Sequence, residues 1–314
     1  MKNVILGSGP LAWWVMHTLV DRNKEVTLLS RSGTTDKHLP AGVEIKKCDA
    51  RDEKQVAKLC EDAETIYFCA MPPYTQWPEL FPRLVKGFLA GATQTQARLV
   101  FGDNLYMYGS TRGAAISETH LHAATGHKGK TRAAVAKQFM EAHERGDNPV
   151  AIGRTSDFFG PEVVNAVLGD MFFGAAYSNK TCNLLGDIDL PHTFCYIKDF
   201  ARGLVTLGTY DLALGQAWHI PSAPSLSTRE MLGFIETGLN KKIKVRTAGK
   251  ALISVLGLFN PMLKEVKEMM YTWQEPYIVD HSKFEKVFGL NVTDHETAVN
   301  ETVAWFNERY SKPQ

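Results

Sequence analysis

Residues 3–31, NVILGSGPLAWWVMHTLVDRNKEVTLLSR, decide the fold class of this chain. A short apolar run, a glycine turn, an amphipathic stretch and a second apolar run follow one another, which is the order strand, turn, helix, strand. The turn, Gly7-Ser8-Gly9-Pro10-Leu11-Ala12, matches G-x-G-x-x-G/A. Its glycines allow the backbone to approach a pyrophosphate, and the helix that follows turns its free N–H groups toward the phosphates. The stretch therefore predicts a dinucleotide site.

The residues that end the second strand indicate which dinucleotide is bound. An acidic residue there would accept a hydrogen bond from the ribose 2′-hydroxyl of NAD. This chain has Ser30-Arg31-Ser32 instead. A guanidinium can pair with a 2′-phosphate, so the sequence favours NADP over NAD. The alternative is that Arg31 is a solvated surface residue.

Apolar runs and amphipathic stretches alternate through the first half of the chain. The runs are dense in Val, Ile, Leu and Phe without strict alternation, as in strands that are buried on both faces of a parallel sheet. This order predicts an α/β protein with a Rossmann-type doubly wound parallel sheet. We expect strands at 3–6, 25–29, 43–48, 65–70, 98–101 and 150–154, and helices at 10–22, 52–61, 77–91 and 129–145.

The second half is less regular and predicts a smaller C-terminal substrate-binding lobe. We place the NAD(P)-binding Rossmann domain at 1–156, with 198–220 returning to it, and the lobe at 157–314. Helix-like segments are expected at 162–173, 198–209, 227–238, 261–272 and 294–308, and short strands at 193–197 and 217–220.

Composition argues against a net electrostatic attraction to several classes of partner, although local basic patches remain possible. Lys and Arg number 35 against 34 Asp and Glu, so no net field would attract nucleic acid or an anionic membrane. The longest apolar stretch, Ala251–Phe259, is shorter than the about 20 residues of a membrane span. Five cysteines without metal-binding spacing predict core thiols in a reducing cytoplasm, and no bound metal.

Two further segments follow strands at the edge where a dinucleotide would lie. Asp49 and Ala50 come after the third strand, where the adenine is expected. Ala70, Met71 and Pro72 come after the fourth strand, below the nicotinamide half. Proline-rich turns are common at strand ends, so this second signal is weak on its own.

Together with the motifs below, these residues give the chain a resemblance to the extended short-chain dehydrogenase/reductases, the NAD(P)-dependent epimerase/dehydratase superfamily. Within that superfamily the chain resembles an atypical branch. The resemblance runs nearly end to end and implies a nicotinamide cofactor and a small-molecule substrate. Asn104-Leu-Tyr-Met-Tyr108-Gly109 is similar to the family's S-x-x-V-Y-G, and Arg154-Thr-Ser-Asp157-Phe-Phe-Gly160-Pro161 to its R-x-x-N-x-Y-G-P. Gly186-Asp187, followed by His192-Thr-Phe-Cys-Tyr196-Ile-Lys-Asp199, resembles its G-D and H-x-x-Y-V-x-D.

The chain departs from the family at the catalytic residues. Asn104 stands at the position of the catalytic Ser or Thr, and Lys128 and Arg132 stand at the positions of the Tyr and the Lys. No Tyr-x-x-x-Lys occurs anywhere in the sequence. In the mechanism that the resemblance implies, the tyrosine transfers a proton to the substrate oxygen and the lysine assists it while holding the nicotinamide ribose.

Four residues remain open as the replacement proton donor: Lys128, Tyr106, His127 and Tyr74. Arg132 can hold a ribose but cannot give up its proton, and Asn104 can donate to a carbonyl oxygen. The resemblance further places Lys128 and Arg154 against the cofactor. It also implies that Tyr74, His127, Asp157, His192 and Tyr196 face the substrate.

Two functions are compatible with these observations. The first is an NADP-dependent oxidoreductase or epimerase/dehydratase-like enzyme for a small carbonyl or hydroxyl compound, for example a sugar. The alternative is a non-catalytic NADP(H)-binding protein that senses redox state. Both allow a homodimer through the helices at 77–91 and 129–145, since the second is rich in small residues.

Overall fold

The computed structural model describes residues 2–259 and 261–311, apart from the side chains of residues 256 and 261. The chain divides into two compact units. The first unit comprises the chain up to Met107, Ala124–Arg154 and Phe200–Ile220. The second comprises Tyr108–Ala123, Thr155–Asp199 and the chain from Pro221 onward.

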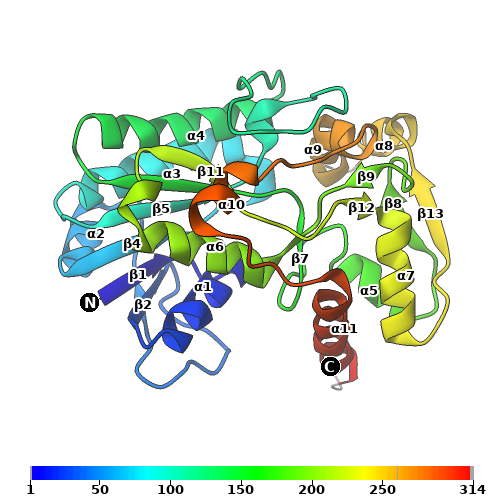
Figure 1. Cartoon of the computed structure of the whole chain (residues 1–314), viewed down its shortest axis with the longest axis horizontal. Coiled ribbons are helices and arrows are strands. Elements are labelled where there is room, and N and C mark those ends of the chain that lie inside the picture. Colours follow the sequence, from blue (N-terminus) through cyan, green and yellow to red (C-terminus); the bar gives the residue numbers. More distant parts are fainter. Residues whose placement is uncertain (1, 260, 312–314) are drawn as a thin grey trace. The chain divides into compact units, whose positions relative to one another are not determined.

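The first unit is built on a seven-stranded parallel sheet with the order β11-β6-β5-β4-β1-β2-β3 (Figure 1). The chain runs outward from β1 through β2 to β3, and then returns to β4 on the other side of β1. Ligands of doubly wound sheets bind at the carboxyl ends of the strands at such a reversal. The strands are β1 (Lys2–Leu6), β2 (Glu25–Ser30), β3 (Glu44–Lys47), β4 (Ala63–Phe68), β5 (Arg98–Asp103), β6 (Val150–Arg154) and β11 (Gln216–His219).

Helices cover both faces of this sheet. On one face α2, α3 and α4 bury a cluster in which Phe68 packs edge-to-face on Phe101 and Phe139. On the other face α1 and α6 come so close that a Cβ atom on Gly102 would lie 2.9 Å from Leu11, and one on Gly153 would lie 2.4 Å from Leu204. The helices are α1 (Pro10–Asp21), α2 (Glu53–Cys60), α3 (Trp77–Ala92), α4 (His127–Glu144) and α6 (Ile197–Thr209), with 3-10 turns η1 (Tyr74–Gln76), η2 (Tyr106–Tyr108) and η3 (Asp211–Ala213).

The fold class predicted from the sequence is confirmed. Each strand and helix expected in the first half is present, with bounds that differ by one or two residues at most ends. The largest shift concerns the strand expected at 65–70, which is Ala63–Phe68. The last hydrogen bond between β4 and β1 runs from the Cys69 N–H to the Leu6 carbonyl at 2.9 Å. The strand ends here because the chain then turns toward Pro72.

The second unit packs helices around its own core and carries three two-stranded sheets. Phe173 stacks on Phe306 with ring centroids 4.0 Å apart, which joins α5 to α11. A capping box between Ser227 and Glu230 starts α7. The strands are β7 (Phe158–Phe159), β8 (Cys182–Leu185), β9 (Pro191–His192), β10 (Cys195–Tyr196), β12 (Leu226–Ser227) and β13 (Val245–Ala248). The helices are α5 (Asp170–Tyr177), α7 (Thr228–Leu239), α8 (Lys250–Leu256), α9 (Pro261–Met269), α10 (Ser282–Phe288), α11 (His295–Ser311) and the turn η4 (Met270–Trp273).

One expected helix of this unit is wrong. The segment 162–173 is irregular until α5 begins at Asp170. Gly160 and Glu162 have φ of +136° and +74°, which a right-handed helix cannot accommodate. The strand expected at 193–197 is reduced to Cys195–Tyr196, and α8 and α10 were not expected.

Candidate active site

The glycine turn after β1 is a constrained piece of backbone. Gly7 has φ +129°, and its N–H donates to the Leu29 carbonyl at 2.8 Å. A Cβ atom at this position would lie 3.0 Å from the carbonyl carbon of Cys69. The turn therefore brings the ends of β1, β2 and β4 together at a place that only glycine fills without strain.

The next glycine is different, because the space beside it is open. Gly9 is the N-cap of α1, no side chain caps the helix there, and a Cβ atom on Gly9 would meet nothing within 4 Å. Ser8 is exposed, Pro10 opens the helix and Ala12 is buried against the sheet. Free first-turn N–H groups beside an open space suit a pyrophosphate, so these residues fit a dinucleotide.

The turn after β2 presents Arg31 to solvent. The Gly33 N–H donates to the Ser30 hydroxyl at 3.0 Å, and the hydroxyls of Ser30 and Ser32 lie 3.3 Å apart. These bonds close the turn on either side of the exposed Arg31. The end of β2 therefore combines two hydroxyls with one cation.

Asp49 lies after β3, beside a second arginine. Arg51 Nε and Nη2 donate to its two carboxylate oxygens at 2.9 Å and 2.6 Å. Chiefly through this pairing the pKa of Asp49 is lowered to about 2, and the charge of Arg31 acts in the same direction. The next residue, Ala50, is buried. The carboxylate at the expected adenine edge is therefore already neutralised by a cation.

A buried charge cluster lies where β5 and β6 end. The carboxylate of Asp103 accepts from Arg132 Nη1 at 3.1 Å and from Arg154 Nε at 3.3 Å. The exposed fractions of the Asp103, Arg132 and Arg154 side chains are 0%, 5% and 4%. Burial lowers the pKa of Arg132, whereas the charge of Asp103 raises it. Asp103 was not among the expected site residues, although a carboxylate that ends an apolar strand is the signal that could have identified it.

Lys128, which the sequence comparison with the family's motif sets at the position of the tyrosine, is fully buried. Its ammonium donates to the Tyr74 carbonyl and lies 4.0 Å from the centre of the Tyr74 ring and 5.2 Å from that of Trp77. The Arg132 guanidinium covers the same indole at 4.3 Å. Aromatic faces thus stabilise both cations through cation–π contacts. The hydrogen bond to the Tyr74 carbonyl directs the Lys128 side chain toward the turn after β4.

That turn, residues 70–77, packs against the charge cluster. Trp77 Nε1 donates to the Pro72 carbonyl at 3.1 Å, and Arg132 Nη2 approaches Met71 Sδ at 3.1 Å. Ala70 and Tyr74 are half-buried. The residues expected after the fourth strand and the two α4 cations are therefore brought together.

Tyr106 lies near Trp77 beside this cluster, and Asn104 helps to form the turn that carries Tyr106. Asn104 Oδ1 accepts from the Tyr106 N–H at 3.1 Å, which opens the 3-10 turn η2. The half-buried Tyr106 ring lies 6.2 Å from the Trp77 ring. The phenolic oxygens of Tyr106 and Tyr74 both lie close enough to the Arg132 guanidinium to raise its pKa. His127, in contrast, is exposed at the start of α4.

The three expected substrate residues of the second unit do not form one group. His192 Nε2 lies 3.0 Å from Asp157 Oδ2, and the buried His192 ring stacks on Trp273 at 4.2 Å. The Tyr196 hydroxyl instead donates to Glu301 of α11 and belongs to the apolar core of the unit.

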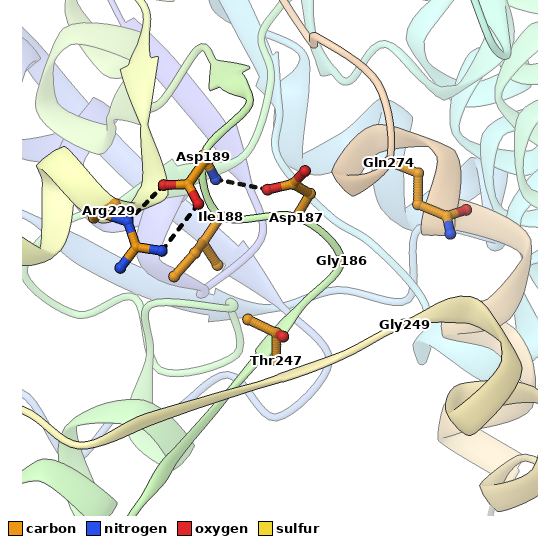
Figure 2. A pocket seen from close by; sticks show the side chains of 8 residues that line it. All are labelled: Gly186, Asp187, Ile188, Asp189, Arg229, Thr247, Gly249 and Gln274. Carbon is orange, nitrogen blue, oxygen red and sulfur yellow. Dashed lines mark hydrogen bonds and ion pairs between the residues drawn. The ribbon is translucent and has the colours of Figure 1, made fainter.

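The second unit also holds a polar pocket that the site residues expected from the sequence did not include. Its volume is about 420 Å³. Figure 2 shows Asp189 between Arg229, with which it pairs at 2.5 Å and 2.9 Å, and Asp187, which accepts from its N–H at 2.9 Å. The remaining lining residues are Gly186, Ile188, Thr247, Gly249 and Gln274.

Neither a metal cluster nor a membrane span is found among the described residues. Nowhere in residues 2–259 and 261–311 do three His, Cys, Asp or Glu side chains converge as metal ligands would. Within the same ranges, every helix is too short or too polar to cross a bilayer.

Comparison with known proteins identifies the family. The model of the NAD dependent epimerase/dehydratase family matches residues 4–218. The chain belongs to this family. No curated protein matches the sequence.

Solved structures of low sequence identity share the fold. UDP-glucuronic acid 4-epimerase from Bacillus cereus, in complex with NAD, has a TM-score of 0.81 and 16% identity, over 99% of this chain and 98% of that one. DesIV, a dTDP-glucose 4,6-dehydratase from Streptomyces venezuelae with NAD and TYD bound, has a TM-score of 0.80 and 18% identity, over 99% and 98%. The Bordetella bronchiseptica enzyme WbmH, in complex with NAD+, has a TM-score of 0.76 and 16% identity, over 98% of each chain.

Proposed function

We propose that this family member is an NADP(H)-dependent oxidoreductase or epimerase/dehydratase-like enzyme for a small carbonyl or hydroxyl compound, with a sugar as the first candidate. The observation that carries the proposal is the uncapped N-terminus of α1 beside the open space at Gly9. NAD is bound in the three similar structures described above. The five cysteines are free thiols, which suits a cytoplasmic protein.

The preference for NADP rests on the turn after β2. Arg31 is exposed between two serine hydroxyls, and the acidic residue that would select NAD is absent from this turn. The carboxylate of Asp49, whose pKa the charge of Arg31 helps to lower, is already paired with Arg51. A 2′-phosphate would therefore meet cations and hydroxyls here rather than an uncompensated negative charge.

When bound, the nicotinamide supplies or accepts the hydride, and the protein must move the accompanying proton. We assign the proton donor to Tyr106. The Tyr106 ring and the Arg132 guanidinium both lie against the Trp77 ring, and the guanidinium, which stays protonated, favours the negative charge left on the Tyr106 oxygen after donation. Lys128 is directed to the Tyr74 carbonyl, so we assign it the positioning of the turn after β4. Asn104 then remains as a hydrogen-bond donor to the substrate oxygen, through its amide nitrogen.

Calorimetric titration with NADPH and NADH tests the cofactor assignment. Arg31→Asp should weaken NADPH at least tenfold, which is about 1.4 kcal/mol, and leave NADH within threefold. Lys24→Asp is the matched control, because it reverses another exposed charge of the first unit, in the loop between α1 and β2. Equal NADPH affinity in wild type and Arg31→Asp would refute NADP selection by this turn.

A panel of carbonyl compounds, read at the NADPH absorbance, tests turnover and the donor. Tyr106→Phe should remove turnover and keep NADPH affinity, whereas Tyr74→Phe, which keeps the carbonyl that Lys128 binds, should retain turnover. If Tyr106→Phe turns over as wild type does, the donor is another residue. Tight NADPH binding without turnover on any compound would instead support the non-catalytic redox sensor, which the absence of a Tyr-x-x-x-Lys pair favours.

We also propose a homodimer through α3 and α4. Sedimentation of the purified protein at micromolar concentration tests this, and a monomer would contradict it.

A further inference from the structure

The α8–α9 hairpin of the second unit exposes a large apolar patch. Five bulky apolar side chains within eleven residues face solvent: Leu252 (46% exposed), Val255 (57%), Leu258 (78%), Phe259 (85%) and Met262 (48%). Scattered exposed apolar residues are normal, but five of them on one short helical hairpin are typical of an interaction surface.

Backbone hydrogen bonds and close helix packing define the connection between α8 and α9, and these apolar side chains face away from it. The Gly257 N–H donates to the Ile253 carbonyl at 2.8 Å, and the Leu258 N–H donates to the Val255 carbonyl at 3.2 Å. A Cβ atom on Gly257 would lie 3.1 Å from the Lys264 backbone, so the two helices approach closely at this point. Ile253 is buried and holds α8 to its unit. The exposed residues of the tip are therefore not needed to close the turn.

The charged side chains that α8 and α9 fully expose are all basic. Residues 246–264, RTAGKALISVLGLFNPMLK, contain three basic residues and no acidic one. Lys250, Lys264 and Lys267 are exposed along the two helices, whereas Glu265 and Glu268 are half-buried. The net charge of +1 for the whole chain conceals this local excess.

We propose that the α8–α9 hairpin docks on an anionic lipid surface, with Leu258 and Phe259 entering the acyl boundary and Lys250 and Lys264 at the level of the phosphates. Apolar side chains flanked by lysines are the composition of interfacial segments that lie on a bilayer without crossing it. A second copy of the chain fits less well. A two-fold contact through this patch would bring the exposed Lys250, Lys264 and Lys267 of both copies together, whereas the acidic residues of α9, Glu265 and Glu268, are half-buried. This proposal is independent of the proposed enzymatic function.

Co-sedimentation of the full chain with vesicles tests the proposal. Vesicles of phosphatidylcholine alone are compared with an equimolar mixture of phosphatidylcholine and phosphatidylglycerol. The wild type should partition to the mixed vesicles at least tenfold more strongly, and added salt should weaken this preference because it screens the lysines. The variant Leu258→Asp/Phe259→Asp should lose at least tenfold of the binding. The variant Lys250→Gln/Lys264→Gln should lose most of the preference for the anionic lipid.

Leu212→Asp is the matched control, since Leu212 is 71% exposed in the first unit and should be dispensable. Unchanged thermal melting of each variant shows that the hairpin changes have not unfolded the protein. Equal binding to both vesicle types, or equal binding by wild type and the Leu258→Asp/Phe259→Asp variant, would overturn the proposal. Dissociation of a wild-type dimer by that variant, without vesicle binding, would show that a second copy covers the patch.

Discussion

Replacing Asp103 by asparagine should destabilise the protein more than almost any other single change in a charged residue. The substitution keeps the shape and removes the negative charge that Arg132 and Arg154 share at 3.1 Å and 3.3 Å. At 3.1 Å, and at an effective dielectric constant of about 20, one such pair attracts by about 5 kcal/mol. The cost of desolvating the charges offsets part of this, and breaking a buried pair typically costs about 3–5 kcal/mol. Because the total stability of a domain is about 5–15 kcal/mol, we expect the loss of about a fifth of it or more.

Urea denaturation followed by far-UV circular dichroism measures this loss. Asp211→Asn is the matched control, because Asp211 pairs with Arg98 at 2.6 Å but is 82% exposed, and an exposed pair contributes about 1 kcal/mol or less. Adding Arg132→Met to Asp103→Asn should restore part of the stability, since it removes a cation that has lost its partner. A loss below about 1 kcal/mol for Asp103→Asn would refute the view that the cluster is a buried ion network.

Three further predictions concern other parts of the first unit. Gly7→Ala should cost about 1–3 kcal/mol of stability because of its φ of +129°, whereas Gly9→Ala, which meets nothing within 4 Å, should leave urea stability unchanged and weaken NADPH binding. Arg51→Ala should raise the pKa of Asp49, measured by NMR, from about 2 toward 3.8. Since the folded pKa lies below the unfolded one, the stabilisation by Asp49 is present above about pH 4 and is lost as the pH falls through about 2. Burial raises the pKa of Cys48 to about 11, so iodoacetamide at pH 8 should alkylate this thiol slowly in the native protein and rapidly in guanidinium, as read by mass spectrometry.

The sheet of the first unit could be predicted because local sequence carries most of its information. Buried parallel strands are continuous apolar runs, and the glycine turn fixes the order strand, turn, helix at its start. The second unit was less predictable for a physical reason. Strands of two residues, such as Phe158–Phe159, are too short to show a period, and tertiary contacts alone define them. Residues 108–123 belong to the second unit although the segments before and after them belong to the first. The amino-acid composition of this segment does not predict that assignment.

The sequence indicated which residues belong to the candidate site, but it did not predict which side chains and backbone groups they contact. The sequence places Lys128 and Arg132 one turn apart on a helix, but a lysine at a helix start is ordinarily solvated. Its burial depends on Tyr74, 54 residues earlier in the chain, whose carbonyl and ring face lie beside the ammonium. The partner of Arg132 depends equally on the register of β5 against β6, which sets Asp103 beside Arg154.

The sequence sets Lys128 and Arg132 at the positions of the family's tyrosine and lysine. This exchange would remove the usual proton donor and would also add one positive charge to the site. Three basic side chains, on Lys128, Arg132 and Arg154, lie buried in the first unit, and the two arginines share the carboxylate of Asp103. Aromatic faces offset part of this excess, since Trp77 lies near both α4 cations. What remains favours any negative charge that forms on a nearby oxygen, because fixed cations in a low dielectric stabilise such charge without having to reorganise. Under the proposed assignment, the phenol of Tyr106 would be stabilised by this field on giving up its proton, so that a tyrosine at the position of Lys128 would not be needed to move one.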